Sequence, residues 1–543
     1  MGTSKCMFAD RSLNLHPMTH PRLVVVVALF LVVFGNFSFF KNVAGVYPPN
    51  PGNIVLLVSV VVTLASFYTL VLSLVTFQKA TKPVLILVLI VSSFTSYFMD
   101  SYSVVIDATM IQNIVQTNVN ESLDLFTVKL VWYFLLLGLL PSVVIYRIKV
   151  QKITLQAELV SKLKIVAVSF FIIIAIVLAF SRFYSSLLRE HKSLRLYTNP
   201  TYFVYSAGKY IAEASQPAAK ALHAIETDAK VPHTDIDKEL VILVVGEAAR
   251  ADRFSLNGYA RETNPLLKKE DVVSFSKMHS CGTSTAVSVP CMFSSFGRDK
   301  YSDSKAKATQ NMIHVLQHAG VNVLWRDNNS DSKGAAVDVP YQDFKIPANN
   351  PACDIECRDE GMLSGLQEYI AGKKDGDILI VLHQMGNHGP AYYKRYPPAF
   401  ERFTPVCKSS QLETCSREEI SNAYDNAILY TDYFLSKVIA LLKQNSAQFE
   451  TVMVYMSDHG ESLGEKGLYL HGMPYFMAPD EQTHIGSIMW FGESYHVDRN
   501  AVKAKSGNEY SQDNLFHTML GLFEVGTSVY DAKKDILNHP NHP

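Results

Sequence analysis

The chain has 543 residues and a formal net charge of -1. This length is too great for one domain of typical size, and so small a net charge gives no basic signal for nucleic acid, so a nucleic-acid-binding protein is not expected. The apolar residues are unevenly spread. Val, Leu, Ile and Phe dominate residues 21–182, whereas the chain from residue 228 onward has the composition of a soluble α/β protein. We therefore expect a membrane part followed by a globular part.

Five segments of the membrane part are apolar and long enough to cross a bilayer, which takes about 20 residues with few charges. They are residues 23–40, 53–77, 83–99, 128–146 and 165–180. The first is an anchor rather than a signal peptide, because the run is long and four more segments follow it. The expected division is a transmembrane domain of five helices at residues 1–182, a linker with interfacial helices at residues 183–237 and a soluble domain at residues 238–543.

Lysine and arginine residues in the loops between these segments predict their orientation. They occur before the first segment and in the loops at residues 78–82 and 147–164, whereas the loop at residues 100–126 contains none. The positive-inside rule therefore puts the N-terminus on the cytoplasmic side. With five segments, the globular part lies on the opposite, extracytoplasmic side.

Two stretches outside the apolar segments leave alternatives open. Residues 108–117 have helical spacing, and this helix either lies at the membrane interface or turns its polar face toward the globular part to hold a lipid head group. The linker after the fifth segment mixes apolar side chains with Arg and Lys. It either lies along the membrane surface or forms a solvated tether.

Six of the seven cysteines lie in the globular part, and each is close in sequence to one other. On the oxidising side of a membrane such a set most simply forms three local disulfides, although other connectivities remain open. A zinc cluster competes for Cys353 and Cys357, but no second Cys or His pair stands at structural-zinc spacing. The three pairs are Cys281 with Cys291, Cys353 with Cys357, and Cys407 with Cys415.

Four apolar runs in the globular part end in polar residues that can bind a metal ion or an anion. They end at Glu247, at Asp327, at His383 and at Asp458 with His459. Helical segments at residues 312–319, 362–371 and 421–444 alternate with these runs, which predicts a largely parallel sheet with helices on both faces. Ligands bind beyond the carboxyl ends of the strands in such sheets, so the site is expected there.

Glu247, Asp458 and His459 are the first candidate metal ligands. A lone Glu at the start of a helix would more often be a carboxylate favoured by the helix dipole. The metal interpretation of Glu247 therefore rests on Asp458 and His459, which occur in the equivalent setting after another strand. Carboxylates with one imidazole suit zinc or manganese better than copper.

Residues 280–291 form a turn of small residues that leads into a short helix. The turn places Thr283, Ser284 and Thr285 at the head of this helix, where backbone N–H groups favour an anion. Hydroxyl groups at such a place are usually caps. A hydroxyl bound to zinc would instead have a lowered pKa and could attack phosphorus, which makes Thr285 a candidate nucleophile.

His388, His471 and Lys333 are further candidates. Both histidines lie in turns bounded by Gly and Pro, where they could complete the metal site, bind a second ion or act as acid and base. Taken singly, each is as readily an ordinary surface or structural histidine. Lys333 offers a cation to a phosphoryl group, although alone it is typical of a solvated loop.

These residues fall in a set of motifs that also identifies a family. The motifs are Val-Gly-Glu-x-x-Arg (245–250), Ser-Cys-Gly-Thr-Ser-Thr-Ala-x-Ser-Val-Pro-Cys-Met (280–292), Gly-Asn-His-Gly-Pro (386–390), Ser-Asp-His-Gly-Glu-Ser-Leu-Gly-Glu (457–465) and Leu-His-Gly-Met-Pro (470–474). Together with the N-terminal spans, they resemble those of the lipid A phosphoethanolamine transferases, which include the mobile colistin resistance enzymes. The resemblance covers nearly the whole chain. It implies five transmembrane helices and a periplasmic α/β domain of the alkaline phosphatase/sulfatase type, in the inner membrane of a bacterium.

The resemblance also implies roles for single residues. Thr285 matches the nucleophile, and the catalytic zinc would be held by Glu247, Thr285, Asp458 and His459. His388 and His471 match histidines that assist the donor or the leaving group, and a second zinc ion could bind near them. The positions that match residues around the phosphoethanolamine are Thr283, Asn329, Ser330 and Lys333, joined by Asn113, Thr117 and Glu121 from the loop at residues 100–126.

The reaction implied is transfer of phosphoethanolamine from phosphatidylethanolamine to a lipid A phosphate through an intermediate on Thr285, which would confer polymyxin (colistin) resistance. The partners implied are the donor lipid, lipid A and membrane lipids, with no nucleic acid, and the chain is expected to be a monomer. One alternative is a phosphatase, a sulfatase or a transferase that acts on another periplasmic acceptor. The other is a catalytically silent membrane sensor that binds zinc or lipid.

Overall fold

The computed structural model describes residues 17–117, 119–151, 153–215, 222–232, 237–373 and 375–538, with the backbone alone for residues 119–121. The chain folds into two compact units. The first contains Met1–Asp107 and Phe126–Gly208, and the second contains Ala108–Leu125 and Lys209–Pro543. The N-terminus, predicted to be cytoplasmic, lies outside the described residues, and the predicted boundaries at residues 182 and 237 stay a prediction.

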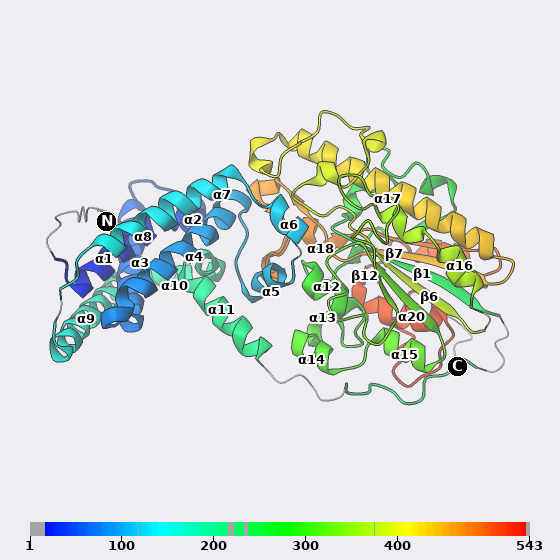
Figure 1. Cartoon of the computed structure of the whole chain (residues 1–543), viewed down its shortest axis with the longest axis horizontal. Helices are drawn as coiled ribbons and strands as arrows, with labels where there is room; N and C mark the ends of the chain where they lie inside the picture. Colours follow the sequence, from blue (N-terminus) through cyan, green and yellow to red (C-terminus); the bar gives the residue numbers. More distant parts are fainter. Residues whose placement is uncertain are drawn as a thin grey trace, which may run out of the picture. The chain divides into compact units, whose positions relative to one another are not determined.

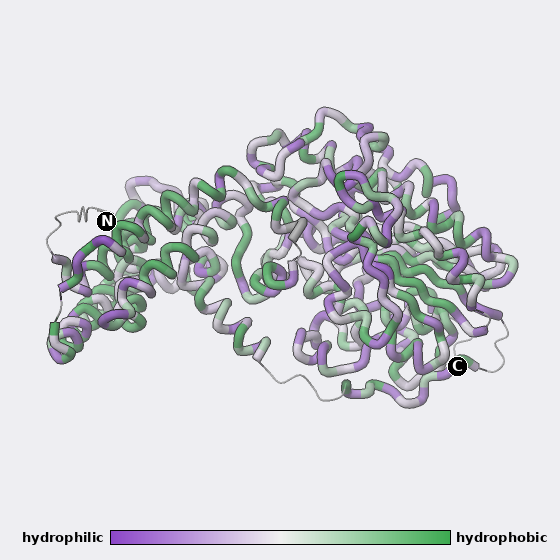
Figure 2. Tube along the Cα trace, viewed as in Figure 1, coloured by the Kyte–Doolittle hydropathy of each residue, from purple (hydrophilic) through white to green (hydrophobic). Residues whose placement is uncertain are grey.

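The first unit is built from apolar helices (Figure 2). Its helices are α1 (His20–Phe34), α2 (Phe37–Val46), α3 (Ile54–Val75), α4 (Thr81–Tyr102), α7 (Val128–Tyr133), α8 (Leu140–Arg147), α9 (Leu155–Ala179), α10 (Ser181–Arg189) and α11 (Thr201–Ala214), whose last residues belong to the second unit. A π-helical turn, Phe134–Leu139, joins α7 to α8 into one continuous span.

Four helices among the described residues are long and apolar enough to cross a membrane. They are Ile54–Val75, Gln78–Tyr102, Val128–Arg147 and Leu155–Ala179. The first predicted span is instead a pair of helices, α1 and α2, bent by 57°. The predicted helical membrane domain is confirmed, with four spans, or five if the bent pair counts as one.

The bend in the first span lies at Gly35 and Asn36, where the helical hydrogen bonds stop. Asn36 Nδ2 donates to the Leu31 carbonyl oxygen at 2.8 Å, and Asn199 Nδ2 donates to the Gly35 carbonyl oxygen at 3.0 Å. Backbone groups freed at a break need such partners, since water does not reach the core of a bilayer. Asn199 comes 163 residues after Asn36, so the local pattern gave no sign of this partner.

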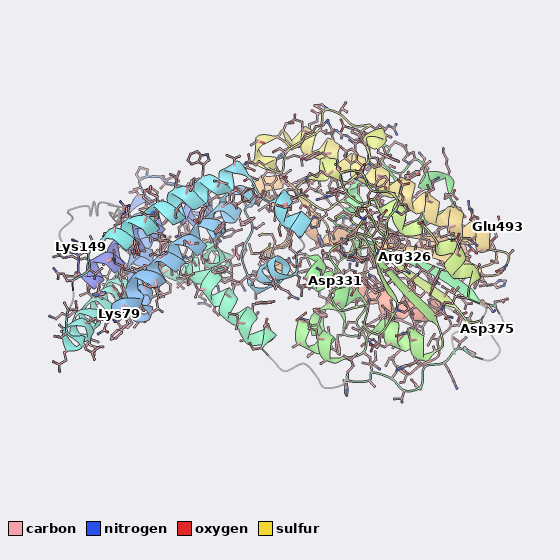
Figure 3. All side chains as sticks on the ribbon, viewed as in Figure 1. Lys79, Lys149, Arg326, Asp331, Asp375 and Glu493 are labelled. Carbon is pink, nitrogen blue, oxygen red and sulfur yellow. A yellow bond between two sulfur atoms is a disulfide. The ribbon has the colours of Figure 1, made fainter. Side chains whose placement is uncertain are left out.

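The two basic loops that the structure describes lie at one end of these helices. Figure 3 shows Lys79 and Lys149 at this end, and Lys82 Nζ donates to the Tyr146 carbonyl oxygen at 2.8 Å. The positive-inside prediction requires both loops on one side of the membrane, and the structure meets this requirement.

A seven-stranded sheet with the order β2-β11-β7-β1-β6-β4-β5 forms the centre of the second unit (Figure 1). The parallel strands are β1 (Glu239–Gly246), β4 (Asn322–Asp327), β5 (Tyr341–Asp343), β6 (Ile378–His383) and β7 (Glu450–Ser457). β11 (Ser487–Phe491) is antiparallel to β7, and β2 (Val273–Ser274) is antiparallel to β11. The predicted largely parallel sheet is confirmed.

Both faces of this sheet are covered by helices. Alternate residues of β1 face opposite sides, so Val241 and Leu243 join one apolar core and Leu240 and Ile242 join the other. The first core includes α12 (Thr285–Met292), α15 (Met312–His318) and α20 (Leu515–Leu522), and the second includes α16 (Leu366–Ala371) and α17 (Arg417–Asn445). A strand that is buried on both faces reads as a continuous apolar run, which is the pattern seen in the sequence.

Shorter elements complete the second unit. They are α5 (Ala108–Gln116), α6 (Val119–Asp124), α13 (Gly297–Lys300), α14 (Asp303–Ala308), α18 (Asp480–Thr483), α19 (Arg499–Lys505), β3 (Met278–His279), β8 (Ser462–Leu463), β9 (Tyr469–Leu470), β10 (His484–Ile485) and β12 (Tyr510–Ser511). Among them, α5 packs against α12.

Candidate active site

The predicted metal ligands meet at the carboxyl edge of the sheet. Glu247 follows β1 and Asp458 follows β7, and the two strands pair in parallel with Gly246 opposite Ser457. One ligand atom each of Glu247, Asp458 and His459 lies within 4.8 Å of the other two, and all three side chains are buried. His459 Nε2 is 3.3 Å from Glu247 Oε1 and 3.3 Å from Asp458 Oδ2.

The hydrogen bonds of these side chains leave atoms that fit a metal ion. His459 Nδ1 lies 2.8 Å from the Gly460 carbonyl oxygen, so Nδ1 carries a proton and Nε2 is the atom that can bind a metal. Asp458 Oδ2 and Glu247 Oε1 are buried, and neither accepts a hydrogen bond from a described residue. Buried carboxylate oxygens are costly without a partner. Two such oxygens and an imidazole nitrogen match the donors that zinc takes in proteins.

The charges of Glu247, Asp458 and His459 also favour a bound cation. Burial lowers the pKa of the His459 imidazole, but the Asp458 and Glu247 carboxylates raise it to about 10. Burial raises the pKa of Glu247, yet the positive charge of His459 outweighs this and holds it well below its usual range. Burial and the neighbouring Glu247 carboxylate raise the pKa of Asp458 to about 6. Two buried carboxylates thus depend on one imidazolium, and a divalent cation would compensate both.

Thr285 joins this cluster from the head of α12. Its Oγ1 donates to Glu247 Oε2 at 3.1 Å and lies 3.4 Å from His459 Nε2. The turn before the helix folds back on it, since the Gly282 N–H donates to Ser288 Oγ at 3.0 Å. One hydroxyl thus contacts two of the three predicted ligands, in the place expected for a nucleophile that shares their metal.

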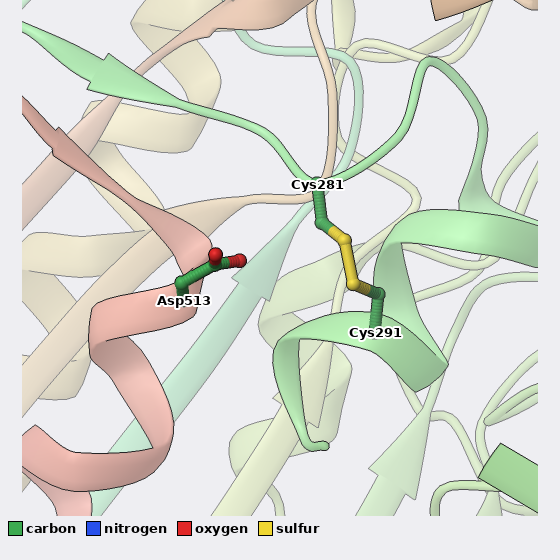
Figure 4. Close-up of side chains that lie close together, drawn as sticks. All are labelled: Cys281, Cys291 and Asp513. Atoms are coloured by element: carbon green, nitrogen blue, oxygen red, sulfur yellow. A yellow bond between two sulfur atoms is a disulfide. The ribbon is translucent and has the colours of Figure 1, made fainter. Parts of the chain in front are cut away.

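A disulfide between Cys281 and Cys291 joins this turn to the end of α12 (Figure 4). Asp513 lies beside it, and its carboxylate accepts the Arg298 N–H at 2.9 Å. The two sulfur atoms are bonded to each other, so this group of donors is not a metal site. The remaining pairs are also those predicted, Cys353 with Cys357 and Cys407 with Cys415.

Asn329 contacts the same carboxylate as Thr285. Asn329 Nδ2 donates to Glu247 Oε2 at 2.8 Å, and the Ser330 N–H donates to Asn329 Oδ1. Lys333 Nζ donates to the Ser330 carbonyl oxygen. The segment after β4 therefore brings three of the predicted phosphoethanolamine-binding residues to the edge of the group formed by Glu247, Asp458 and His459.

Thr283 and His471 are joined through the backbone. The Gly472 N–H donates to the Thr283 carbonyl oxygen at 2.8 Å, and Thr283 Oγ1 donates to the Met473 carbonyl oxygen at 2.7 Å. The turn that carries His471 is thereby fixed to the turn that carries Thr285.

The two predicted histidines lie together beside His459. The ring centroids of His459 and His471 are 4.2 Å apart, and those of His388 and His471 are 5.9 Å apart. Sequence reasoning missed Glu461, whose Oε2 lies 2.8 Å from His471 Nδ1. The signal was present, because Glu461 stands three residues after Asp458 in the same motif. His459, Glu461 and His471 form a second group of donors that could hold a metal ion.

The helix predicted at residues 108–117 is α5, and it belongs to the unit that holds the site. Lys333 Nζ donates to the Gln116 carbonyl oxygen at 3.2 Å, and Gln112 Nε2 donates to Asp303 Oδ1 at 3.2 Å. Of the two alternatives for this helix, these contacts favour the one in which its polar face turns toward the globular part.

The structure shows a contact near the site for one of the three predicted substrate residues of this segment, a local contact for the second, and no side chain for the third. A Cβ atom at Gly472 would lie 3.8 Å from Asn113 Nδ2, so Asn113 is close to the turn that carries His471. Thr117 Oγ1 donates to the Asn113 carbonyl oxygen at 2.6 Å, within its own segment. The side chain of Glu121 lies outside the described residues.

Comparisons with known proteins identify the family of the chain. Residues 239–525 match the sulfatase family model, and residues 64–215 match the model described as phosphoethanolamine transferase EptA/EptB. Phosphatidylethanolamine transferase Mcr-2 from Escherichia coli is 42% identical over 515 residues, which are 93% of this chain and 95% of the relative.

Two further relatives cover almost the full length. Phosphoethanolamine transferase EptA from Escherichia coli K12 is 40% identical over 95% of this chain and 96% of its own. The solved structure of the integral membrane protein lipooligosaccharide phosphoethanolamine transferase A from Neisseria meningitidis superposes with a TM-score of 0.92, at 34% identity, over 96% of this chain and 99% of that one. The chain therefore belongs to the EptA and Mcr family of phosphoethanolamine transferases, with a catalytic unit of the alkaline phosphatase/sulfatase type.

Proposed function

We propose that the chain transfers phosphoethanolamine from phosphatidylethanolamine to a phosphate group of lipid A, with Thr285 as the nucleophile. The observation that carries this proposal is the Thr285 hydroxyl, which donates to Glu247 Oε2 at 3.1 Å and lies 3.4 Å from His459 Nε2. A hydroxyl is a weak nucleophile until its pKa is lowered. Family membership supplies the group that is transferred, because the relatives are phosphatidylethanolamine and phosphoethanolamine transferases.

Glu247, Thr285, Asp458 and His459 would hold the zinc ion. This assignment is supported by the buried Glu247 Oε1 and Asp458 Oδ2, which accept no hydrogen bond from a described residue and share only the charge of His459. When bound, zinc supplies positive charge beside the phosphoryl group and lowers the pKa of the hydroxyl. A second ion near His388 and His471 is part of the proposal, supported by the donor group of His459, Glu461 and His471.

The transfer proceeds by two displacements at one phosphorus atom. In the first, Thr285 Oγ1 bonds to phosphorus and gives its proton to the Glu247 carboxylate, to which it already donates, and the bond from phosphorus to the glycerol oxygen breaks. His388 or His471 gives a proton to this oxygen, so diacylglycerol leaves. In the second, an oxygen of the lipid A phosphate bonds to phosphorus and its proton goes to the same histidine, while Thr285 Oγ1 leaves and takes its proton back from Glu247. The charge on the transferring group is offset by Lys333.

The remaining predicted residues bind the donor. Asn329 and Ser330 stand beside Glu247 on the segment that carries Lys333. Thr283 is fixed to the turn that carries His471. The other positions assigned to the substrate are those of the segment after the third apolar segment, Asn113, Thr117 and Glu121.

The chain acts in the inner membrane with its catalytic unit in the periplasm, as a monomer. The loop charges support this orientation, and two lipid substrates require an enzyme held at the membrane. The added ammonium group lowers the net negative charge of lipid A. It thereby weakens the attraction of the cell surface for cationic polymyxins such as colistin.

The test is mass spectrometry of lipid A from Gram-negative cells that express the wild-type chain or Thr285→Ala. Thr414→Ala, an exposed threonine of the same unit, is the matched control. Wild type and Thr414→Ala should each add one phosphoethanolamine mass to lipid A and raise the colistin concentration that inhibits growth, and Thr285→Ala should do neither. Unmodified lipid A in cells with folded, zinc-loaded wild type would overturn the proposal.

A further inference from the structure

A buried ion pair connects the segment 108–125 to the turn that carries His388. Asp124, the last residue of α6, has a side chain that is 6% exposed, and that of Arg395 is 2% exposed. Arg395 Nη2 donates to Asp124 Oδ2 at 2.8 Å, and Lys394 Nζ pairs with Asp124 Oδ1. The partners stand 271 residues apart in sequence.

The same guanidinium holds the His388 backbone. Arg395 Nε donates to the His388 carbonyl oxygen at 2.6 Å, and Arg395 Nη1 pairs with Glu356. The planar guanidinium presents its donors in a fixed fork, so an acceptor at one edge orients the donors at the other. Asp124 and Glu356 therefore set the angle at which Arg395 meets the His388 carbonyl.

The charges of this group are balanced, which explains how it can be buried. Arg395 and Lys394 carry two positive charges, and Asp124 and Glu356 carry two negative ones. Burial raises the pKa of Asp124, but the charges of Arg395 and Lys394 outweigh this and lower it. Removal of Asp124 would leave the buried guanidinium of Arg395 with one carboxylate fewer, whereas the Lys394 side chain is 30% exposed and can be solvated.

The His388 turn is also fixed at the residues that precede His388. The Met385 and Gly386 N–H groups donate to Asp359 at 2.8 and 3.1 Å, and the Asn387 N–H donates to the Glu247 carbonyl oxygen at 3.0 Å. Arg395 contacts the His388 residue itself, whose N–H also donates to the Met385 carbonyl oxygen at 3.2 Å.

We propose that Arg395 is a positioning residue that fixes His388 for phosphoryl transfer, and that Asp124 of the segment between two membrane spans holds Arg395 in place. The inference rests on the proposed function, because it takes His388 to serve the donor or the leaving group. Its consequence is that the active site is complete only while α6 lies against the catalytic unit.

A purely structural ion pair would behave differently. If Asp124 only held α6 in place, the loss of other contacts that hold the segment 108–125 would lower turnover by as much. Lys394 shares Asp124 but does not contact His388 in the described hydrogen bonds, and Asp303 accepts from Gln112 of α5. Lys394→Gln and Asp303→Asn are therefore matched controls for Asp124→Asn.

The experiment uses the full chain, purified with zinc in detergent micelles, with a short-chain phosphatidylethanolamine as donor and lipid A as acceptor. Diacylglycerol release gives kcat and KM, and hydrogen exchange with mass spectrometry follows the amides of residues 385–391. Asp124→Asn should lower kcat by about tenfold to a hundredfold, with KM within about threefold of wild type. It should also speed exchange in residues 385–391. Asp124→Glu should recover most of the turnover, and the two controls should keep it.

A second variant covers the case in which Asp124→Asn does not fold. Arg395→Lys keeps the charge beside Asp124 but has no Nε–H for the His388 carbonyl. Its kcat should therefore fall by as much as that of Asp124→Asn. Unchanged exchange in residues 385–391, full turnover of either variant, or equal losses in the controls would overturn the proposal. Absence of transfer by the wild type would instead overturn the proposed function.

Discussion

The carboxylate of Glu461 holds the imidazole of His471: Glu461 Oε2 lies 2.8 Å from His471 Nδ1. The other oxygen, Oε1, accepts the Tyr392 hydroxyl at 2.6 Å. An acceptor at Nδ1 fixes the tautomer in which Nε2 keeps its lone pair, and it fixes the orientation of the ring. Since the His471 ring lies 4.2 Å from that of His459, this tautomer decides what His471 can offer at the active site.

Glu461→Gln should therefore lower turnover. The amide nitrogen of Gln cannot accept from Nδ1, and an amide oxygen holds the ring less firmly than a carboxylate does. We expect a loss of about tenfold to a hundredfold in kcat, which is typical when the partner of a functional histidine is removed. Tyr392→Phe leaves the bond from Glu461 to His471 in place and should cost less. A folded, zinc-loaded Glu461→Gln chain with full kcat would contradict this role.

The main residues of the site could be predicted because they follow strands. Parallel strands bring their carboxyl ends to one edge, and Glu247 after β1 and Asp458 after β7 lie close because these two strands are also neighbours in the sheet. Thr285 was found from its turn of small residues and from the family motif. These signals are local, and local signals can be read from one sequence.

The parts that could not be predicted depend on contacts between distant residues. Nothing near Asp124 indicates Arg395, and nothing near Asn36 indicates Asn199. Such pairs arise only when the whole chain has folded, and no periodicity encodes them. Sequence reasoning also left open which way the helix at residues 108–117 faces, because its polar side suits an interface and a protein surface equally well.

Removal of zinc should abolish turnover and lower stability. Without the ion, the buried carboxylates of Glu247 and Asp458 share only the charge of His459. At a zinc concentration 100-fold above Kd, the stabilisation lost on chelation is about 3 kcal/mol. Metal content, melting temperature and diacylglycerol release should fall together with a chelator and recover with zinc.

The variant Glu247→Gln tests the metal site more specifically. This variant should retain less zinc than wild type and should melt at nearly the same temperature with and without chelator. His279→Gln, a histidine outside the cluster, should behave as wild type does. Full activity of a chain shown to be free of metal would exclude the zinc site.

Acid should destabilise the catalytic unit through His517. Burial lowers the pKa of its imidazole to about 4, and His517 Nδ1 accepts the Asp531 N–H at 3.1 Å, which requires the neutral ring. The unfolded chain binds this proton near pH 6.5, so it holds more protons than the folded chain between about pH 6.5 and 4. Stability therefore falls as the pH drops through this window.

Melting temperatures between pH 7.5 and 4.5 can isolate this contribution. His517→Asn keeps an acceptor in the place of Nδ1 but does not titrate, so its melting temperature should depend less on pH than that of wild type. His496→Gln removes a side chain that is 89% exposed and should keep the wild-type slope. Equal slopes for wild type and His517→Asn would show that His517 is not responsible.

The disulfides allow a comparison in which position is the main difference. Cys281 and Cys291 are 10 residues apart, and Cys407 and Cys415 are 8 apart. Loops of such similar length predict a similar loss of stability on removal of either bond, about 3 kcal/mol in the chain-entropy account. Only the first bond fixes the turn that presents Thr285, so only its removal should also lower kcat. Double Cys→Ser variants at each pair should therefore shift the melting temperature alike, whereas diacylglycerol release should fall for Cys281 and Cys291 alone. If both variants kept wild-type kcat below their melting temperatures, the first disulfide would contribute to stability and not to the position of Thr285.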